Sequence, residues 1–225
     1  LSAQFVRKQL NMNTSLAVQE KKEARPAKVP QSVAETPSIT GTSEEGKVPD
    51  QKLHALELLF GSTMSVMCGE YDIPGLTFDS PTILDIGANE GSFAIWALFR
   101  WPGCKVICYE PCKETFKKLQ ACAETQSRIT TINAAVTEQV KPFLRYGVNS
   151  NQENSIVDLG CQRKEGEPVE SVRPFDLPKA DFVKIDTEGC EVEILRAYLN
   201  KHLPAGIALE WHSAADRYAL GQLLR

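Results

Sequence analysis

The fold is decided by residues 81–91, which read PTILDIGANEG. The short apolar run Thr82 to Ile86 has the length of a buried strand, and a loop with two glycines, Gly87 and Gly91, follows it at once. Residues 91–100 then carry apolar side chains at helical spacing. A strand, a glycine loop and a helix in this order are typical of the first unit of a parallel sheet, whose ligands bind at the carboxyl ends of the strands.

Strands and helices alternate along the rest of the chain. We expect further strands at 105–109, 129–133, 181–185 and 206–210, and helices at 112–124, at 188–199 and from about residue 214. Residues 139–174 are polar and glycine-spaced, and we expect a hairpin and a loop there. Strands separated by helices of about ten residues predict an α/β fold with an open, mostly parallel, doubly wound sheet.

The N-terminal part differs from the rest of the chain in amino-acid composition and in apolar periodicity. Residues 1–49 are rich in Gln, Ser, Thr, Pro, Lys and Glu and show no apolar period, so we expect a disordered tail or linker. We expect the folded domain to span residues 50–225 and to open with a helix whose apolar stripe holds Leu53, Leu56, Leu59 and Phe60. The basic residues of the tail also fit the remnant of an organelle transit peptide, which would place the protein in a stroma or matrix.

The amino-acid composition indicates which classes of ligand and which cellular compartment the chain fits. The 225 residues carry a net charge of −4, which gives the chain no electrostatic drive to coat nucleic acid, and we expect a small or neutral ligand. No uncharged apolar run approaches the roughly 18 residues of a membrane-spanning helix. Seven cysteines, an odd number, favour a reducing compartment such as the cytoplasm, and Cys104, Cys108 and Cys112 are expected to be buried free thiols. The sequence does not indicate the oligomeric state.

Four of the predicted strands end in an acid: Asp85, Glu110, Asp186 and Glu210. A single carboxylate at a strand end is often a helix cap, but four around one crevice point to a ligand site. Glu110 follows Gly91 at the distance, about 20 residues, where an acid can accept both ribose hydroxyls of an adenosine.

The glycine loop distinguishes between adenosine ligands. Its pattern is Asp85-x-Gly87-x-Asn89-x-Gly91, so asparagine stands where a dinucleotide fingerprint has its second glycine. That departure disfavours a pyrophosphate and with it a nicotinamide-dependent oxidoreductase, which we keep as an alternative. S-adenosylmethionine carries a sulfonium and an ammonium instead, and Asp85 could orient the loop or meet the amino group directly.

Four segments together resemble the FkbM family of S-adenosylmethionine-dependent methyltransferases: Ile83–Gly91, Tyr109-Glu110-Pro111, Asp181–Glu191 and Ala208–His212. The K-I-D-x-E-G run in the third segment is the most specific. The resemblance implies a Rossmann-like class I methyltransferase fold, and it implies strands after Glu210 for which only one helix of sequence remains, so we expect a sheet truncated at its C-terminal end. Glu70 with Tyr71 resembles the acidic and aromatic pair that precedes the loop. The expected cofactor-binding residues are Glu70, Asp85, Gly87, Asn89, Gly91, Glu110 and Asn133.

The fourth strand of the series carries the candidate catalytic residues. Alternation places Phe182, Lys184 and Asp186 on one face, and a lysine inside a covered strand is costly unless a carboxylate pairs with it. We expect its partner to be Asp186, Glu188 or Glu210. This could be a purely structural ion pair; our functional interpretation is that Lys184 holds the acids while Asp186 and Glu188 point at the methyl group and the acceptor.

A hydroxyl acceptor would also need a base, and His212 is a candidate alongside Asp186. Asn133 could meet the adenine ring or serve only the turn. Asp186, Glu188, Glu210 and His212 could together collect a divalent cation, but we predict no metal. We therefore expect O-methylation of a hydroxyl on a small molecule or glycan. A non-catalytic methyltransferase-like binding module is the second alternative.

Overall fold

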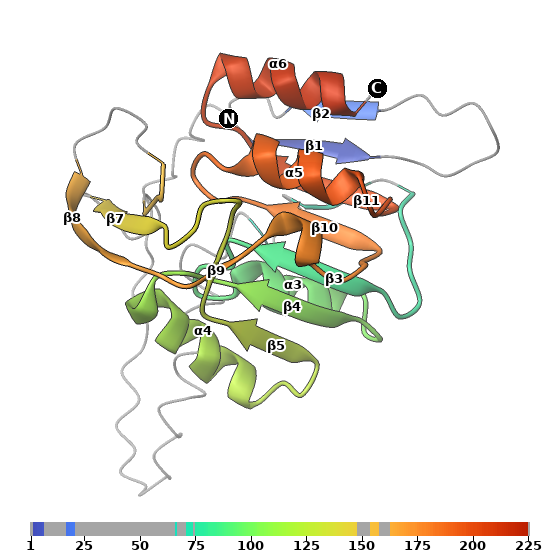
Figure 1. Cartoon of the computed structure of the whole chain (residues 1–225). Helices are drawn as coiled ribbons and strands as arrows, with labels where there is room; N and C mark the ends of the chain where they lie inside the picture. Colours follow the sequence, from blue (N-terminus) through green and yellow to red (C-terminus); the bar gives the residue numbers. More distant parts are fainter. Residues whose placement is uncertain are drawn as a thin grey trace, which may run out of the picture.

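The strands predicted from the sequence form one continuous sheet. In a computed structural model of the chain, which describes residues 2–6, 17–20, 66, 71–73, 75–147, 154–157 and 163–224, the strand order is β2-β1-β11-β10-β3-β4-β5 (Figure 1). The five strands from β11 to β5 are parallel to one another, as the α/β prediction requires. Their bounds are β3 Thr82–Ile86, β4 Lys105–Tyr109, β5 Ile129–Ile132, β10 Phe182–Ile185 and β11 Gly206–Glu210.

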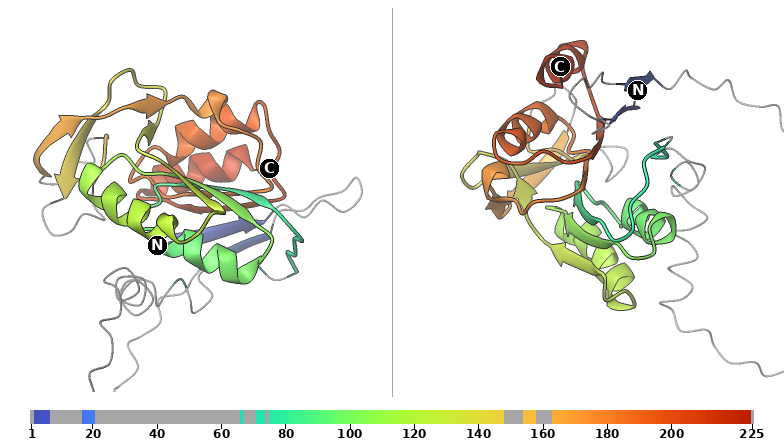
Figure 2. Two further views of the ribbon diagram at one scale, coloured as in Figure 1. Left: turned by 90° about the horizontal axis from the view of Figure 1, so that it is seen from below. Right: turned by 90° about the vertical axis from the view of Figure 1, so that its right-hand side faces the viewer.

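Helices cover both faces of this sheet, so the doubly wound architecture is confirmed. Helices α3 (Ser92–Arg100) and α4 (Lys113–Glu124) lie on one face, and α5 (Glu191–Leu199) and α6 (Ala214–Leu223) lie on the other (Figure 2). Successive side chains of a strand point to opposite faces of the sheet, and each face has its own hydrophobic core. Phe182 packs with the aromatic residues of α3, while Val183 and Ile185 pack under α5. The sheet is therefore buried on both sides, and its free surface for a ligand is the edge where the parallel strands end.

The irregular segment between β5 and β10 contains the expected hairpin. Strands β7 (Phe143–Gly147) and β8 (Arg163–Pro168) pair antiparallel, and two short strands, β6 (Ala135–Val136) and β9 (Ser171–Val172), pair beside them. A 3-10 turn, η3 (Pro174–Asp176), leads into β10. Residues 154–157, between β7 and β8, pair with β7 through a bridge from Arg145 to Ser155.

The sheet does not end at β11, where the resemblance led us to expect truncation. Strand β1 (Ser2–Val6) pairs antiparallel with β11, and β2 (Ala17–Glu20) pairs antiparallel with β1. Segments from the N-terminal region thus occupy the places beyond β11. The rest of the predicted tail 1–49 and the helix expected from residue 50 lie outside the described residues, so the domain boundary stays a prediction.

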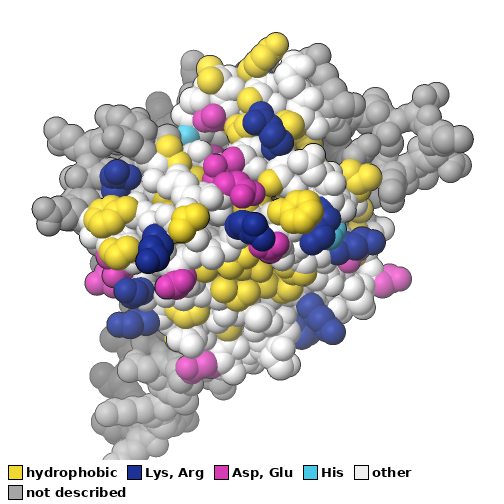
Figure 3. Space-filling model, viewed as in Figure 1, with side chains coloured by type: hydrophobic (Ala, Val, Ile, Leu, Met, Phe, Trp, Pro, Cys, Tyr) yellow, Lys and Arg dark blue, Asp and Glu magenta, His cyan; other side chains and the backbone are white. Residues whose placement is uncertain are grey.

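The described part of the chain also bears on cysteines and charge. Five cysteines are buried free thiols, among them Cys104, Cys108 and Cys112, as predicted. No described helix combines the length and the apolar composition needed to cross a membrane. On the face drawn in Figure 3, the coloured basic and acidic side chains are interspersed without a broad basic patch, in keeping with the net charge of −4.

Candidate functional site

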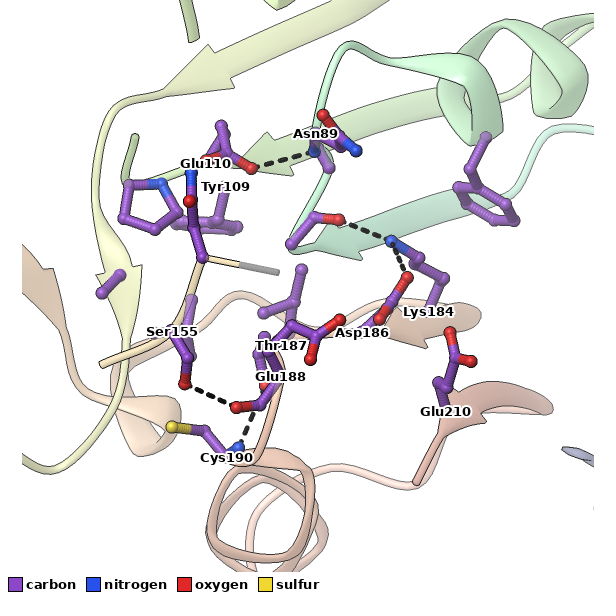
Figure 4. A pocket seen from close by; sticks show the side chains of 18 of the residues that line it. Asn89, Tyr109, Glu110, Ser155, Lys184, Asp186, Thr187, Glu188, Cys190 and Glu210 are labelled. Atoms are coloured by element: carbon purple, nitrogen blue, oxygen red, sulfur yellow. Dashed lines mark hydrogen bonds and ion pairs between the residues drawn. The ribbon is translucent and has the colours of Figure 1, made fainter. Parts of the chain in front are cut away.

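A cavity of about 460 Å³ opens at the carboxyl ends of the parallel strands, where ligands of such sheets bind (Figure 4). Asn89 and Glu110 lie on one side of it, and Lys184, Asp186 and Glu210 lie on the other. Residues 154–156, which follow the first strand of the hairpin, complete the wall. The acids at the strand ends therefore meet around one crevice, with the exception of Asp85, which is fully buried behind it.

The glycine loop touches the loop after β10. Gly87 has a φ of 76°, and a Cβ at this position would lie 1.7 Å from the backbone oxygen of Asp186. The amide of Gly87 donates to the carbonyl of Tyr109 at 3.0 Å, which ties the loop to the end of β4. Only glycine combines this conformation with this close approach, so Gly87 permits the contact between two loops that line the cavity.

Gly91 has a different task. It precedes α3 with a φ of 97°, and a Cβ there would lie 2.9 Å from the Cδ1 atom of Leu119 on α4. It does not line the cavity. Gly91 therefore allows α3 and α4 to approach each other at the end of the glycine loop.

Glu110 is held by backbone amides on both sides. Its Oε2 accepts from the amide of Asn89 at 2.9 Å, and its Oε1 accepts from the amide of Cys112 at 2.8 Å. Burial raises the pKa of Glu110 to about 7, although these amides favour the charged form. Each carboxylate oxygen retains a lone pair that can accept another hydrogen bond from within the cavity.

Asn133 supports the turn after β4. Its Nδ2 donates to the carbonyls of Glu110 at 2.8 Å and Pro111 at 3.1 Å. The side chain is thus used in the turn, which is the second of the two roles expected for it, and it is not among the residues that line the cavity.

Lys184 is buried and holds three groups together. Its ammonium donates to the backbone oxygen of Gly87 at 2.6 Å and forms ion pairs with Asp85 at 3.3 Å and Asp186 at 3.6 Å. Burial lowers the pKa of Lys184, but the two carboxylates outweigh burial and hold this pKa above its usual value. The ammonium therefore stays charged and fixes the glycine loop against the end of β10.

Asp85 is a partner that the sequence analysis did not assign to Lys184. Glu188 and Glu210, two of the three partners we expected, form no ion pair with the lysine among the contacts of the described residues. Asp85 and Lys184 are directly paired across β3 and β10. This contact follows from the register between β3 and β10, which are distant in sequence, so the sequence alone did not reveal it. Burial raises the pKa of Asp85, and the Lys184 charge opposes that rise.

The loop after β10 carries the two acids expected to face the reaction. Asp186 and Glu188 both line the cavity, and Glu188 has a left-handed φ of 56°. Ser155 Oγ donates to the backbone oxygen of Glu188 at 2.6 Å, which docks the hairpin insertion onto this loop. The loop takes up residues that we had placed in a helix, so α5 begins at Glu191 rather than at residue 188.

His212 lies behind Glu188. Its Nδ1 is 3.4 Å from the Oε2 of Glu188, and its Nε2 is 3.5 Å from the Oε1 of Glu191. Burial lowers the pKa of His212, but its interaction with Glu191 and the charges of Glu188 and Glu210 outweigh burial and raise this pKa to about 9. Burial also raises the pKa of Glu188, to about 7. At neutral pH the imidazole is therefore protonated, and Glu188 is close to its midpoint.

Ligand atoms of Asp186, Glu188 and His212 lie within 4.8 Å of one another, a spacing that could hold a metal ion. The same atoms already face positive charge, because Lys184 pairs with Asp186 and the His212 imidazolium faces Glu188. A cation would have to displace the proton of His212, so we derive no step through a metal.

The structure brings most of the predicted site residues to one place. Those that line the cavity are Gly87, Asn89, Glu110, Lys184, Asp186 and Glu188. Those that stand behind its wall are Asp85, Gly91, Asn133 and His212. Glu70 lies outside the described residues, although its neighbour Tyr71 lines the cavity. Glu191 was not among the predicted site residues, yet it is fully buried at the start of α5 and bonded to the loop after β10.

Several known proteins are similar to this chain. A methyltransferase named sdnD from Sordaria araneosa is 23% identical over 195 residues, which is 68% of this chain and 75% of that protein. The solved structure of a precorrin-6y C5,15-methyltransferase from Geobacter metallireducens superposes with a TM-score of 0.42 at 16% identity, over 81% of this chain and 73% of that one. The mitomycin 7-O-methyltransferase MmcR gives a TM-score of 0.37 at 16% identity, over 78% and 46% of the two chains.

A family model gives the stronger result. The methyltransferase FkbM domain matches residues 85–222, more than half of the chain, and this range holds the glycine loop, Glu110 and the loop after β10. Membership of a methyltransferase family implies a cofactor of the S-adenosylmethionine type, and ligands of open α/β sheets bind at the carboxyl ends of the strands. The chain therefore belongs to the FkbM methyltransferase family.

Proposed function

We propose that this protein transfers the methyl group of S-adenosylmethionine to a hydroxyl group of a small molecule or glycan. The observation that carries the proposal is that Glu188, a carboxylate with a pKa of about 7, lines the same cavity as the glycine loop and Glu110. A group with this pKa can accept a hydroxyl proton at neutral pH and release it again.

The cofactor would bind at the side of the cavity where Asn89 and Glu110 lie. Glu110 would accept the ribose hydroxyls with its remaining lone pairs, in charge-assisted hydrogen bonds. Among the described residues that line the cavity, Lys184 is the sole basic side chain, and Asp85 and Asp186 already pair with it. Few positive charges are thus left for a pyrophosphate, which supports S-adenosylmethionine over a nicotinamide dinucleotide.

The chemistry needs alignment and a proton acceptor. The bound cofactor would supply a methyl group on a positively charged sulfur, and this sulfur would become the neutral thioether leaving group of the transfer to the acceptor oxygen. Glu188 would take the hydroxyl proton, and Asp186 on the same loop would orient the acceptor. His212, although we considered it as the base, carries a proton at neutral pH and therefore serves as the charged partner of Glu188.

The first experiment separates the candidate functions by ligand. We expect S-adenosylhomocysteine to raise the melting temperature of the purified chain and NAD to leave it unchanged. Stabilisation by NAD alone would support the oxidoreductase. Incubation with methyl-labelled S-adenosylmethionine and a metabolite and glycan extract, followed by mass spectrometry, would then identify the acceptor and the methylated atom. Cofactor binding without any transfer would support the non-catalytic binding module.

We also propose a cytoplasmic location, because the described cysteines are buried free thiols. The organelle stroma or matrix remains the alternative. Fluorescence microscopy of the tagged protein in cells would distinguish the two.

A further inference from the structure

Glu191, the first residue of α5, is a buried carboxylate that accepts several hydrogen bonds from one loop. Its exposed fraction is 0%, and it does not line the cavity. Its Oε1 accepts from the amide of Thr187 at 2.8 Å and from the hydroxyl of Thr187 at 3.1 Å, and its Oε2 accepts from the amide of Gly189 at 3.1 Å. A buried carboxylate is costly without such partners, so this side chain and the loop hold each other in place.

The loop that Glu191 holds is the one that carries Asp186 and Glu188 into the cavity. Its backbone is unusual, because Glu188 has a φ of 56° and Gly189 a φ of 120°. A left-handed conformation at a residue with a side chain persists only where the surroundings impose it, and such residues concentrate at active sites. The hydrogen bonds that Glu191 accepts from Thr187 and Gly189 lie on both sides of Glu188, and together with the bond from Ser155 Oγ to the Glu188 carbonyl they hold this conformation.

Glu191 also reaches the same loop by a second route. The imidazole of His212, just after β11, has its Nε2 at 3.5 Å from Glu191 and its Nδ1 at 3.4 Å from Glu188. One charged ring therefore lies between the buried carboxylate and the carboxylate of the cavity wall. This bridge fixes the side chain of Glu188, whereas the hydrogen bonds of Glu191 fix its backbone.

We infer that Glu191 is a positioning residue for methyl transfer, which holds the backbone of residues 187–189 directly and the Glu188 carboxylate through His212. This inference rests on the proposed function, in which Glu188 accepts the proton of the acceptor. The simpler reading of Glu191 is a cap for the first turn of α5. A cap would affect stability only, whereas a positioning residue affects turnover in a folded protein.

Glu191→Gln tests the difference, because glutamine keeps the shape but loses the charge and one acceptor oxygen. We expect the dissociation constant for S-adenosylhomocysteine, measured by calorimetry, to change by less than about threefold. We expect kcat to fall about ten- to a hundredfold, as misplacement of a reacting group predicts. Glu114→Gln in the first turn of α4, which is an exposed position, is the control and should leave both values unchanged.

A second readout does not depend on catalysis. The chain has three histidines, so the imidazole signals of His212 can be assigned by NMR. The carboxylates that face His212 are Glu188, Glu191 and Glu210, and they hold its pKa near 9. Loss of the Glu191 charge should therefore move the titration of His212 to lower pH. A wild-type chain without methyl transfer would refute the proposed function. The titration of His212 would still test whether His212 links Glu191 to Glu188.

Two outcomes would overturn the inference. A Glu191→Gln protein with wild-type kcat and only a lower melting temperature would make Glu191 a helix cap. An unshifted His212 titration would break the link between the two carboxylates. If Glu191→Gln does not fold, His212→Gln removes the charged ring between Glu191 and Glu188 instead. Wild-type turnover in that variant would equally contradict the proposal.

Discussion

Glu110 is preorganised before any ligand binds, because two backbone amides fix both of its carboxylate oxygens. Preorganisation of this kind lets a ligand hydroxyl gain the full hydrogen bond without ordering the side chain. We expect Glu110→Ala to weaken S-adenosylhomocysteine binding roughly ten- to a hundredfold in calorimetry, from the loss of charge-assisted bonds to ribose. Glu138→Ala, at an exposed position, is the control. Unchanged affinity in a folded Glu110→Ala protein would refute the ribose assignment.

Glu188 should set the pH dependence of turnover. With the cofactor saturating, kcat should rise with pH through about 7, because the carboxylate accepts a proton only after losing its own. The groups that face Glu188 are His212, Asp186, Glu210 and Glu191. Glu188→Gln should remove this acid limb and lower kcat about a hundredfold or more. A Glu188→Gln variant that keeps the acid limb and the wild-type kcat would contradict the role of Glu188 as the proton acceptor.

Residue identities were easier to predict than residue partners. The strand-end acids were visible in the sequence because each follows a short apolar run. The pairing of Lys184 with Asp85 was not, because it depends on β10 lying directly beside β3, and the two strands are almost a hundred residues apart. Glu191 was missed for a related reason: it resembles any acid in the first turn of a helix until its bonds to Thr187 and Gly189 are known.

At the level of elements, the buried strands were predicted well. The bounds of β3, β4 and β11 agree with the sequence prediction to the residue, because each is an apolar run that ends at a turn or an acid. The start of α5 was placed three residues too early. Gly189 is a poor helix former, and Glu191 and the approach of Gly87 to Asp186 hold the loop open. These are tertiary contacts, which local propensity does not report.

The contact between the glycine loop and the loop after β10 gives a prediction at this scale. Gly87→Ala would place a Cβ 1.7 Å from the Asp186 backbone oxygen, at a φ of 76° that alanine rarely adopts, so the two loops must separate. We expect the free energy of unfolding to fall by about 2 kcal/mol or more and cofactor binding to weaken. The measurements are urea unfolding and calorimetry.

Gly221→Ala provides the control for this substitution. A Cβ at Gly221 in α6 meets nothing within 4 Å, so alanine there should raise the stability by about 0.5 to 1 kcal/mol. The assigned role of Gly87 would be refuted if Gly87→Ala matched the wild type in both measurements.

On the scale of the whole molecule, the sheet is assembled from segments that are remote in sequence. β1 lies beside β11, although about 200 residues separate them along the chain. Periodicity could not predict this pairing, because the position of β1 is set by the neighbouring strands whose backbones it pairs with, and one of these, β11, is remote in sequence. The five central strands were predictable because strands that are buried on both faces consist largely of apolar residues.

The charges of the site should also be visible in the stability of the whole protein. Glu110 and Glu188 have pKa values of about 7 in the folded state and about 4.5 when unfolded, so the folded state retains protons that the unfolded chain releases between these values. His212 does the same between 6.5 and about 9. In both windows the folded state binds more protons, so the free energy of unfolding falls as pH rises.

We therefore expect stability to decrease from pH 5 to pH 8, by at most about 1.4 kcal/mol for each unit of pKa shift that a group titrates through. Urea unfolding followed by circular dichroism at fixed ionic strength would measure this slope. The double variant Glu188→Gln with His212→Gln should flatten it, because it removes two of the three groups, whereas Glu114→Gln should leave it unchanged. Stability that rose over this range would mean that the burial of these carboxylates does not raise their pKa values, and the argument for Glu188 as the proton acceptor would fail with it.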